Sequence, residues 1–214
     1  MVFHVLNRGV GRMRLFLKAA DFAAFERAIE KTLESRPMRI CAYCLMSNHW
    51  HLLLWPEHDG DLGAFLQKMT IAHVRNWQEN RHRVGYGRLY QGRYKSFPVE
   101  PDEHFYQVVR YVERNALRAN LVDRAEEWRW SSLWRRVHGT ADDRRWLAGW
   151  PLTDPRGWPK LVNEPQTDQE LEAIRRSVIR GQPYGREAWV QQAAKSLGLE
   201  STLRRRGRPR KQPS

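Results

Sequence analysis

Alternating and continuous runs of apolar residues predict four β-strands in the first half of this chain. They cover residues 2–6, 38–46, 49–55 and 89–99, the last with an irregular entry. Apolar residues at helical spacing predict helices over about 21–35, 62–80 and 102–118, with Asp21 and Asp102 as N-caps. The order β-α-β-β-α-β, with one helix appended, predicts an α+β fold built on a ferredoxin-like sheet.

The second half of the chain has a different pattern. Residues 123–165 are rich in tryptophan and broken by proline and glycine, which predicts short helices and loops packed on the core. Amphipathic helices are predicted over 168–180 and 186–198, and a basic tail follows from Leu203. We therefore expect a core over residues 1–122, a packing extension over 123–165 and a basic helical module over 166–214.

The candidate chemistry centres on His49 and His51, at the start of the predicted strand 49–55. Alternate strand residues face the same side, so the two imidazoles share a face and Trp50 points the other way. Two imidazoles about 7 Å apart along a strand can hold one metal ion if a third ligand completes the site. A histidine in a strand is more often a half-buried residue bonded to a carbonyl, so the interpretation depends on partners elsewhere.

The predicted helix over 102–118 supplies such partners. Tyr111 and Asn115 are four residues apart, so they share a helical face. A divalent cation held by His49, His51 and the Asn115 oxygen can polarise a phosphodiester, and Tyr111 can attack the phosphorus to give a covalent phosphotyrosine. The structural alternative for Tyr111 is a tyrosine at the rim of the core with its hydroxyl in solvent.

The net charge of +13 is unevenly distributed along the chain. Residues 175–214 hold eleven Lys or Arg against two Asp or Glu, a local charge of +9, which leaves only +4 for the remainder. Such polarity favours a polyanionic partner, most often nucleic acid. A membrane surface is less favoured, because the last basic run lacks apolar anchors.

Cysteine usage and hydropathy exclude several other classes. Cys41 and Cys44 have no second cysteine pair to complete a zinc site, and we expect both to be small core residues on opposite faces of a strand. No apolar run approaches the roughly 20 residues that cross a bilayer, and the N-terminus lacks the pattern of a signal peptide. We therefore expect a cytoplasmic protein.

Three ordered motifs resemble a known family. The stretch Tyr43-Cys44-Leu45-Met46-Ser47-Asn48-His49-Trp50-His51-Leu52-Leu53 contains the histidine–hydrophobic–histidine motif of HUH single-strand DNA nucleases. It is followed by Tyr90-Gln91-Gly92-Arg93-Tyr94-Lys95 and by Tyr111-Val112-Glu113-Arg114-Asn115-Ala116-Leu117-Arg118-Ala119. Together they look like the core of single-tyrosine HUH transposases, and most of all like the domesticated branch, the REP-associated tyrosine transposases.

The resemblance implies an HUH nuclease fold that cleaves single-stranded DNA beside a hairpin such as a REP-like palindrome. It further implies a 5′-phosphotyrosine intermediate, dependence on Mg²⁺ or Mn²⁺, and a bacterial, nucleoid-associated protein, with a monomer favoured over a dimer. Carried over by position, His49 and His51 are metal ligands, Tyr111 is the nucleophile and Asn115 is the third ligand.

The sequence departs from the family pattern at three places. Ala116 and Ser47 stand where relatives commonly have proline, and neither change removes a reacting group. Relatives also have a short basic lead-in before the first strand. We therefore expect either a different start codon or a reduced DNA-binding arm.

Further basic and aromatic residues are candidates for DNA contact. Arg93 and Lys95 can hold the scissile phosphate or the hairpin backbone, and the alternative is a solvated strand face. Tyr90, Tyr94 and Trp77 can stack on unpaired bases, although core packing is favoured for each. The tail resembles an AT-hook that enters the minor groove of A/T-rich duplex, or is a basic tail that binds any backbone, through Arg204, Arg205, Arg206, Arg208, Arg210 and Lys211.

Two rival functions stay open at this stage. One is a DNA-binding or regulatory protein that keeps the HUH fold but has little or no catalytic activity, which the basic C-terminal charge favours. The other, ranked last, is a metal-dependent RNA nuclease. A metal-dependent single-stranded DNA endonuclease and strand transferase is the preferred prediction.

Overall fold

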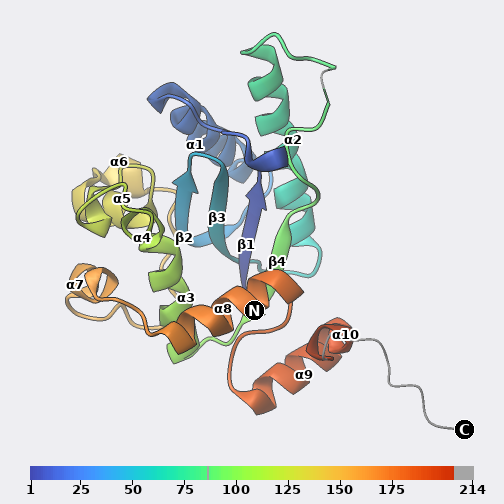
Figure 1. Cartoon of the computed structure of the whole chain (residues 1–214), viewed down its shortest axis with the longest axis vertical. Coiled ribbons are helices and arrows are strands. Elements are labelled where there is room, and N and C mark those ends of the chain that lie inside the picture. The colour runs from blue at the N-terminus through green and yellow to red at the C-terminus, as the bar shows by residue number, and fades with distance from the viewer. Residues whose placement is uncertain (86, 205–214) are drawn as a thin grey trace, which may run out of the picture.

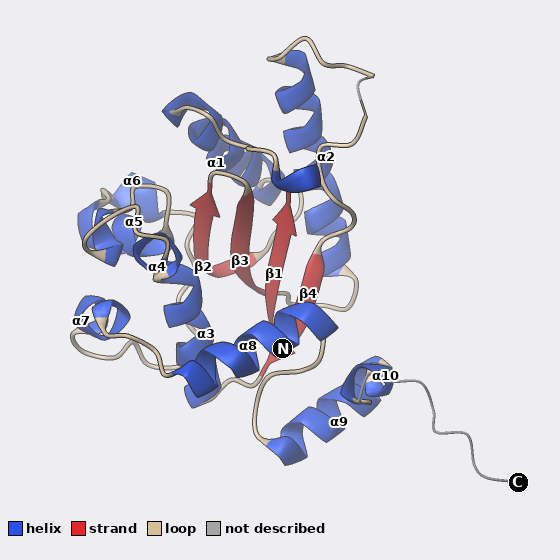
Figure 2. Ribbon diagram, viewed as in Figure 1, coloured by secondary structure: helices blue, strands red, loops and turns tan. Residues whose placement is uncertain are grey.

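A computed structural model describes residues 1–85 and 87–204 of the 214-residue chain. Its centre is a four-stranded antiparallel sheet of order β2-β3-β1-β4 (Figure 2), made of β1 (Val2–Arg8), β2 (Arg39–Met46), β3 (His49–Trp55) and β4 (Lys95–Val99). Strands β1 and β2 are separated by β3, as in a split βαβ unit. The predicted α+β class and ferredoxin-like order are confirmed.

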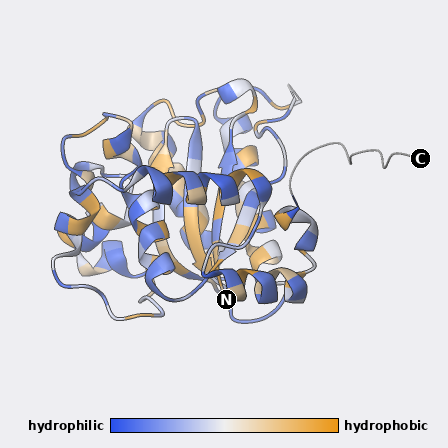
Figure 3. Ribbon diagram, turned by 60° about the horizontal axis from the view of Figure 1, so that its bottom comes forward, coloured by the Kyte–Doolittle hydropathy of each residue, from blue (hydrophilic) through white to orange (hydrophobic). Residues whose placement is uncertain are grey.

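Two long helices cover one face of the sheet. Helices α1 (Ala19–Leu33) and α2 (Asp61–Glu79) bury Phe25 and Phe65 in one core with Trp50 and Leu52 of β3. Figure 3 shows apolar residues concentrated on the central strands, while the helices around them carry both apolar and polar residues. Trp50 thus points into the helical layer, away from its histidine neighbours, as strand alternation predicts.

The opposite face is covered by helices from the second half of the chain (Figure 1). Helix α3 (Glu103–Glu113) packs on β2 and β3, and its residues Phe105, Val109 and Val112 are fully buried. The remaining helices are α4 (Asn115–Arg118), α5 (Ser132–His138), α6 (Ala141–Arg144), α7 (Trp158–Asn163), α8 (Asp168–Arg180), α9 (Glu187–Leu197) and α10 (Glu200–Leu203), with 3₁₀ turns at Val10–Arg12 and Ala125–Glu127. Within the described ranges, no helix is both long and apolar enough to cross a membrane.

Several predicted boundaries are wrong. Helix α1 starts at Ala19, not at Asp21, because the Asp21 carboxylate reaches back to accept the Leu17 and Lys18 N–H groups at 2.8 and 3.2 Å. Strand β4 starts at Lys95, not near residue 89. Before it, Tyr90 makes only an isolated bridge with Gly9.

The predicted helix 102–118 is divided in two. Asp102 caps it as expected and accepts the His104 N–H at 3.0 Å, but regular helix stops at Glu113. Arg114 has φ −79° and ψ 0°, and its guanidinium donates to the carbonyl oxygens of Val162, at 3.1 Å, and Asn163. This long-range anchor holds the bend between α3 and α4.

Cys41 and Cys44 are both fully buried, as predicted, but not on opposite faces. The register of β2 against β3 shifts between Ile40 and Ala42, which is a β-bulge at Cys41. The extra residue resets the alternation, so both cysteines join the core between the sheet and α3.

Part of the predicted tail lies outside the described residues, namely Arg205, Arg206, Arg208, Arg210 and Lys211. Arg204, directly after α10, is described and exposed. The expected minor-groove contact through this segment stays a prediction, as does the division of the chain at residues 122 and 165.

Candidate active site

The two histidines of β3 share one face of the sheet. Their rings lie 5.0 Å apart, centroid to centroid, at 82° to each other. Opposite them on β1, His49 pairs with Arg8 and His51 pairs with Leu6. The same face carries His4, whose ring lies 5.0 Å from the His51 ring. Strand alternation and antiparallel register thus bring three imidazoles together.

Hydrogen bonds occupy the same ring nitrogen in both histidines of β3. His51 Nδ1 lies 2.9 Å from His4 Nε2, and His49 Nδ1 lies 2.6 Å from the Asn48 side-chain oxygen. Metal-binding histidines typically use one nitrogen in this way, which orients the ring and leaves the other nitrogen for the ion. The Nε2 atoms of His49 and His51 are therefore the candidate donors.

All three imidazoles are held in the neutral form that coordinates metals. Burial lowers the pKa of His4 to about 3 and that of His49 to about 4. Burial also holds the pKa of His51 well below its ordinary value, with further lowering from the neighbouring histidines and Arg118.

Helix α3 brings Tyr111 to this cluster. The Tyr111 ring lies edge-on to His51, at 5.9 Å between centroids, and 6.2 Å from His4. Tyr111 is only 8% exposed. Arg118 covers its ring, with the guanidinium carbon 4.3 Å from the ring centroid. The phenol, two imidazoles and a guanidinium thus form one compact group.

Asn115 lies at the start of α4, beyond the bend at Arg114, and is 7% exposed. The next residue, Ala116, is buried in the same core cluster as Cys44, and Cys44 pairs with His51 across β2 and β3. The structure therefore brings the start of α4 beside the His51 row of the sheet. The role of Asn115 as a metal ligand stays a prediction.

The sheet register places Lys95 beside the cluster. Lys95 pairs with Leu6, in the same cross-strand row as His51, and alternation from Phe97 places it on the histidine face. Arg93 precedes β4, outside the regular strand. Both side chains are exposed, and their contact with DNA stays a prediction.

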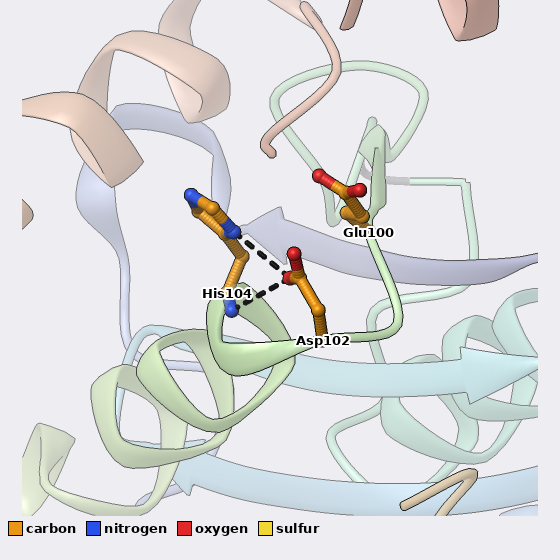
Figure 4. A group of neighbouring side chains, drawn as sticks. All are labelled: Glu100, Asp102 and His104. Atoms are coloured by element: carbon orange, nitrogen blue, oxygen red, sulfur yellow. Dashed lines mark hydrogen bonds and ion pairs between the residues drawn. The ribbon is translucent and has the colours of Figure 1, made fainter. Parts of the chain in front are cut away.

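A second group of metal-type ligands lies at the other end of β4, where Glu100, Asp102 and His104 approach one another (Figure 4). His104 Nδ1 lies 2.8 Å from Asp102, and Arg186 contacts both carboxylates, with Nε 2.9 Å from Glu100 and 3.3 Å from Asp102. A guanidinium already pairs with both carboxylates. We therefore regard the group as the attachment of the C-terminal segment to α3, not as the metal centre.

Two residues of the site, His4 and Arg118, are not among those predicted from the sequence. His4 lies in a strand predicted without a functional role, although a histidine in an otherwise apolar strand is itself a signal. Arg118 lies one turn beyond the predicted ligand Asn115, at the end of α4, and its guanidinium lies over the Tyr111 ring.

Comparison with known proteins agrees with this geometry. The family model described as "Transposase IS200 like" matches residues 1–115. A Haemophilus influenzae protein named as a REP-associated tyrosine transposase is 24% identical over 130 residues, which is 57% of this chain and 74% of that protein.

A solved structure of a REP-associated tyrosine transposase bound to a REP hairpin has the same fold. It superposes with a TM-score of 0.53 at 20% identity, covering 78% of this chain and 92% of the other. The family match spans more than half of the 214 residues and includes the histidine pair, Tyr111 and Asn115. The chain therefore belongs to the IS200-like transposase family, whose members act on DNA.

Proposed function

We propose that this protein is a single-stranded DNA endonuclease and strand transferase that cleaves beside hairpins through Tyr111. One observation carries the proposal, namely that Tyr111 lies beside the histidine pair, with its ring centroid 5.9 Å from that of His51. Among the described residues, the Nε2 atoms of His51 and His49 make no hydrogen bond to the protein, because both rings use Nδ1. Family membership and the hairpin bound by a relative of the same fold support a DNA substrate of this kind.

The residues present fit a divalent metal ion. Two neutral imidazoles with oriented rings, from His49 and His51, and the amide oxygen of Asn115 are a donor set for a divalent ion. The amide oxygen and the oxygens of the substrate phosphate are the ligands that Mg²⁺ or Mn²⁺ prefers. When bound there, such an ion would polarise the scissile phosphate and offset charge in the transition state.

Tyr111 forms the covalent link in this proposal. Its phenolic oxygen attacks the phosphorus, the bond from phosphorus to the 3′ oxygen breaks, and that oxygen takes up a proton. The products are a 5′-phosphotyrosine and a free 3′-hydroxyl, so the phosphodiester energy is kept for rejoining. The guanidinium of Arg118 lies over the face of the Tyr111 ring and makes a cation–π contact with it.

The test uses the full chain, Mn²⁺ and a single-stranded oligonucleotide containing a hairpin. We expect a protein–DNA adduct that survives denaturation and is lost in Tyr111→Phe. Tyr106→Phe is the matched control, because its hydroxyl on the same helix donates to the Thr153 carbonyl at 2.7 Å, away from the histidines. An undiminished adduct in Tyr111→Phe would contradict the assignment of Tyr111 as the nucleophile.

The same assay separates the rival functions. A DNA-binding regulator without catalysis, which the C-terminal charge of +9 favours, gives salt-dependent binding but no adduct on any hairpin. An RNA nuclease prefers RNA of the same sequence. Adduct formation on DNA alone excludes both.

A further inference from the structure

Glu113, the last residue of α3, carries a carboxyl group that the proposed cleavage chemistry does not use. It is fully buried, and each of its oxygens accepts one hydrogen bond. The Ser132 hydroxyl donates to Oε1 at 2.6 Å, and the Trp158 indole N–H donates to Oε2 at 2.7 Å. A carboxyl in a core is costly unless its oxygens have partners, so this pair of donors defines one position for the side chain.

The two donors come from different elements of the second half of the chain. Ser132 begins α5 and is itself fixed to β2, because its hydroxyl oxygen accepts the Tyr43 N–H at 2.9 Å. Trp158 begins α7 and is 7% exposed. One carboxyl group therefore connects the end of α3 to the sheet through α5 and also to α7. Both donors lie outside residues 1–115, the range that the family model matches.

The same end of α3 carries the candidate nucleophile. Tyr111 and Glu113 are two residues apart, so their side chains leave the helix axis in directions about 200° apart. The Tyr111 ring meets His51 on the sheet side, and Glu113 meets its two donors on the far side. Contacts on opposite sides of a helix fix its rotation about its own axis. The contacts of Glu113 therefore determine how Tyr111 lies against the histidines.

The bend that follows Glu113 is held by the same helix α7. Arg114 donates to the carbonyl oxygens of Val162, at 3.1 Å, and Asn163. Two consecutive residues at the end of α3 thus hydrogen-bond to α7. Asn115, the predicted third metal ligand, comes directly after them. A shift of this end of α3 would displace the nucleophile and the predicted ligand together.

We propose that Glu113 is a positioning residue for the cleavage reaction, which holds Tyr111 against the histidine pair through its two hydrogen bonds. This inference rests on the proposed function, and it adds α5 and α7 to the elements that support the active site. Glu113 acts through the helix and contacts neither the DNA nor the reacting atoms.

The test removes one donor and measures single-turnover adduct formation on a hairpin oligonucleotide with Mn²⁺. We expect Trp158→Phe to lower the rate constant at saturating DNA by about 10- to 100-fold, because a small displacement of a reacting group has an effect of this size. The affinity for the oligonucleotide should stay at the wild-type value. A loss of folded protein would instead reduce the final amount of adduct and leave the rate constant unchanged.

Trp150→Phe is the matched control. The Trp150 indole N–H donates to the Cys41 carbonyl at 2.9 Å, and its ring packs on Phe105 near the start of α3, away from the bend. The substitution removes the same kind of hydrogen bond from the same tryptophan-rich segment, so we expect the wild-type rate constant. Equal slowing in Trp150→Phe, or a wild-type rate constant in Trp158→Phe, overturns the proposal.

Glu113→Gln separates the hydrogen bonds from the charge. The amide oxygen can accept from Trp158, and the amide N–H can donate to the Ser132 hydroxyl. That hydroxyl can then donate to the Tyr43 carbonyl, which lies 3.2 Å away. We expect Glu113→Gln to keep most of the wild-type rate constant. A rate constant as low as that of Trp158→Phe would contradict positioning through hydrogen bonds.

A spectroscopic readout keeps this proposal separate from the cleavage function. With fluorotyrosine incorporated, the fluorine resonance of Tyr111 is assigned from its absence in Tyr111→Phe. Without DNA or metal, we expect this resonance to shift in Trp158→Phe and to keep its wild-type position in Trp150→Phe and Glu113→Gln. A wild-type chain that forms no adduct contradicts the cleavage function alone. An unshifted resonance in Trp158→Phe overturns the positioning role.

Discussion

At the residue scale, the histidine pair depends on a residue of another strand. His51 keeps its ring orientation through a 2.9 Å hydrogen bond with His4, which is fully buried and pairs with Leu53. A second hydrogen bond lies on the other face, where the Trp50 indole N–H donates to the Tyr90 hydroxyl at 2.9 Å, and that hydroxyl also lies against His73 Nδ1. The motif is therefore fixed from both sides of the sheet.

Replacing His4 tests whether it positions His51. We expect His4→Leu to weaken Mn²⁺ binding by about 10- to 100-fold, because removing a partner that orients a metal-binding histidine has this effect. Calorimetric titration measures it. His4→Gln places an acceptor near the position of Nε2 and should restore most of the affinity.

Two results would contradict this role. One is wild-type Mn²⁺ affinity in a folded His4→Leu protein. The other is an equal reduction in His4→Gln, which would indicate packing and not the hydrogen bond.

The residue scale also shows what sequence reasoning can and cannot reach. Strand alternation is enough to place His49 and His51 on one face and Trp50 on the other. It cannot show that His4 meets His51, because that hydrogen bond depends on the register of two strands and joins residues 47 positions apart. The bulge at Cys41 likewise has no local signature in the sequence.

At the element scale, side chains near the helix starts determine where a helix begins. Asp21 lies in the first turn of α1, where its carboxylate accepts two backbone N–H groups and pairs with Arg81 of the segment after α2 at 2.7 Å. Burial alone would raise the pKa of Asp21, but the hydrogen bonds from Leu17 and Lys18 and the charge of Arg81 outweigh it and hold the pKa below 3.8.

This carboxylate gives a pH-dependent prediction. A lowered pKa contributes stability that is fully present above the unfolded value and is lost as the pH falls through the folded value. We expect Asp21→Ala to lower the free energy of unfolding by about 1 kcal/mol at neutral pH, and the difference to shrink below about pH 4. Urea unfolding at several pH values measures it.

Asp59→Ala, in an exposed loop, is the control for removing one acid. A difference between wild type and Asp21→Ala that grows as the pH falls would reverse the assigned sign.

Helix α3 shows why boundaries are predicted unevenly. Helix α8 matches its predicted range of 168–180, because its cap and apolar spacing are local. The break after Glu113 is not predictable, since the carbonyl groups that hold Arg114 come from α7, 48 and 49 residues later. That break decides where Asn115 and Arg118 lie.

The attachment of the C-terminal segment to α3 gives another prediction at this scale. Arg186 contacts Glu100 and Asp102, and Tyr184 lies against His104, so removing the guanidinium should loosen residues 182–197. We expect Arg186→Ala to speed amide hydrogen exchange in that range and to leave β1 and β3 unchanged. Lys195→Ala is the control. Unchanged exchange of residues 182–197 in Arg186→Ala would contradict the attachment.

At the scale of the whole molecule, the two faces of the sheet have different roles. One face carries the histidine cluster beside Tyr111 of α3, and the other packs against α1 and α2. The charge of the C-terminal forty residues, taken from composition alone, indicates nucleic acid as the partner. Composition cannot indicate the histidine cluster, which forms only when β1, β3 and α3 come together.

The central claim is that Tyr111 forms the covalent bond to DNA, and peptide mapping tests it most directly. Trypsin cuts after Arg110 and Arg114, so Tyr111 lies alone in the peptide Tyr-Val-Glu-Arg, separate from Tyr106. We expect mass spectrometry of the digested adduct to find the nucleotide on that peptide. A nucleotide on any other peptide of the chain would contradict the account.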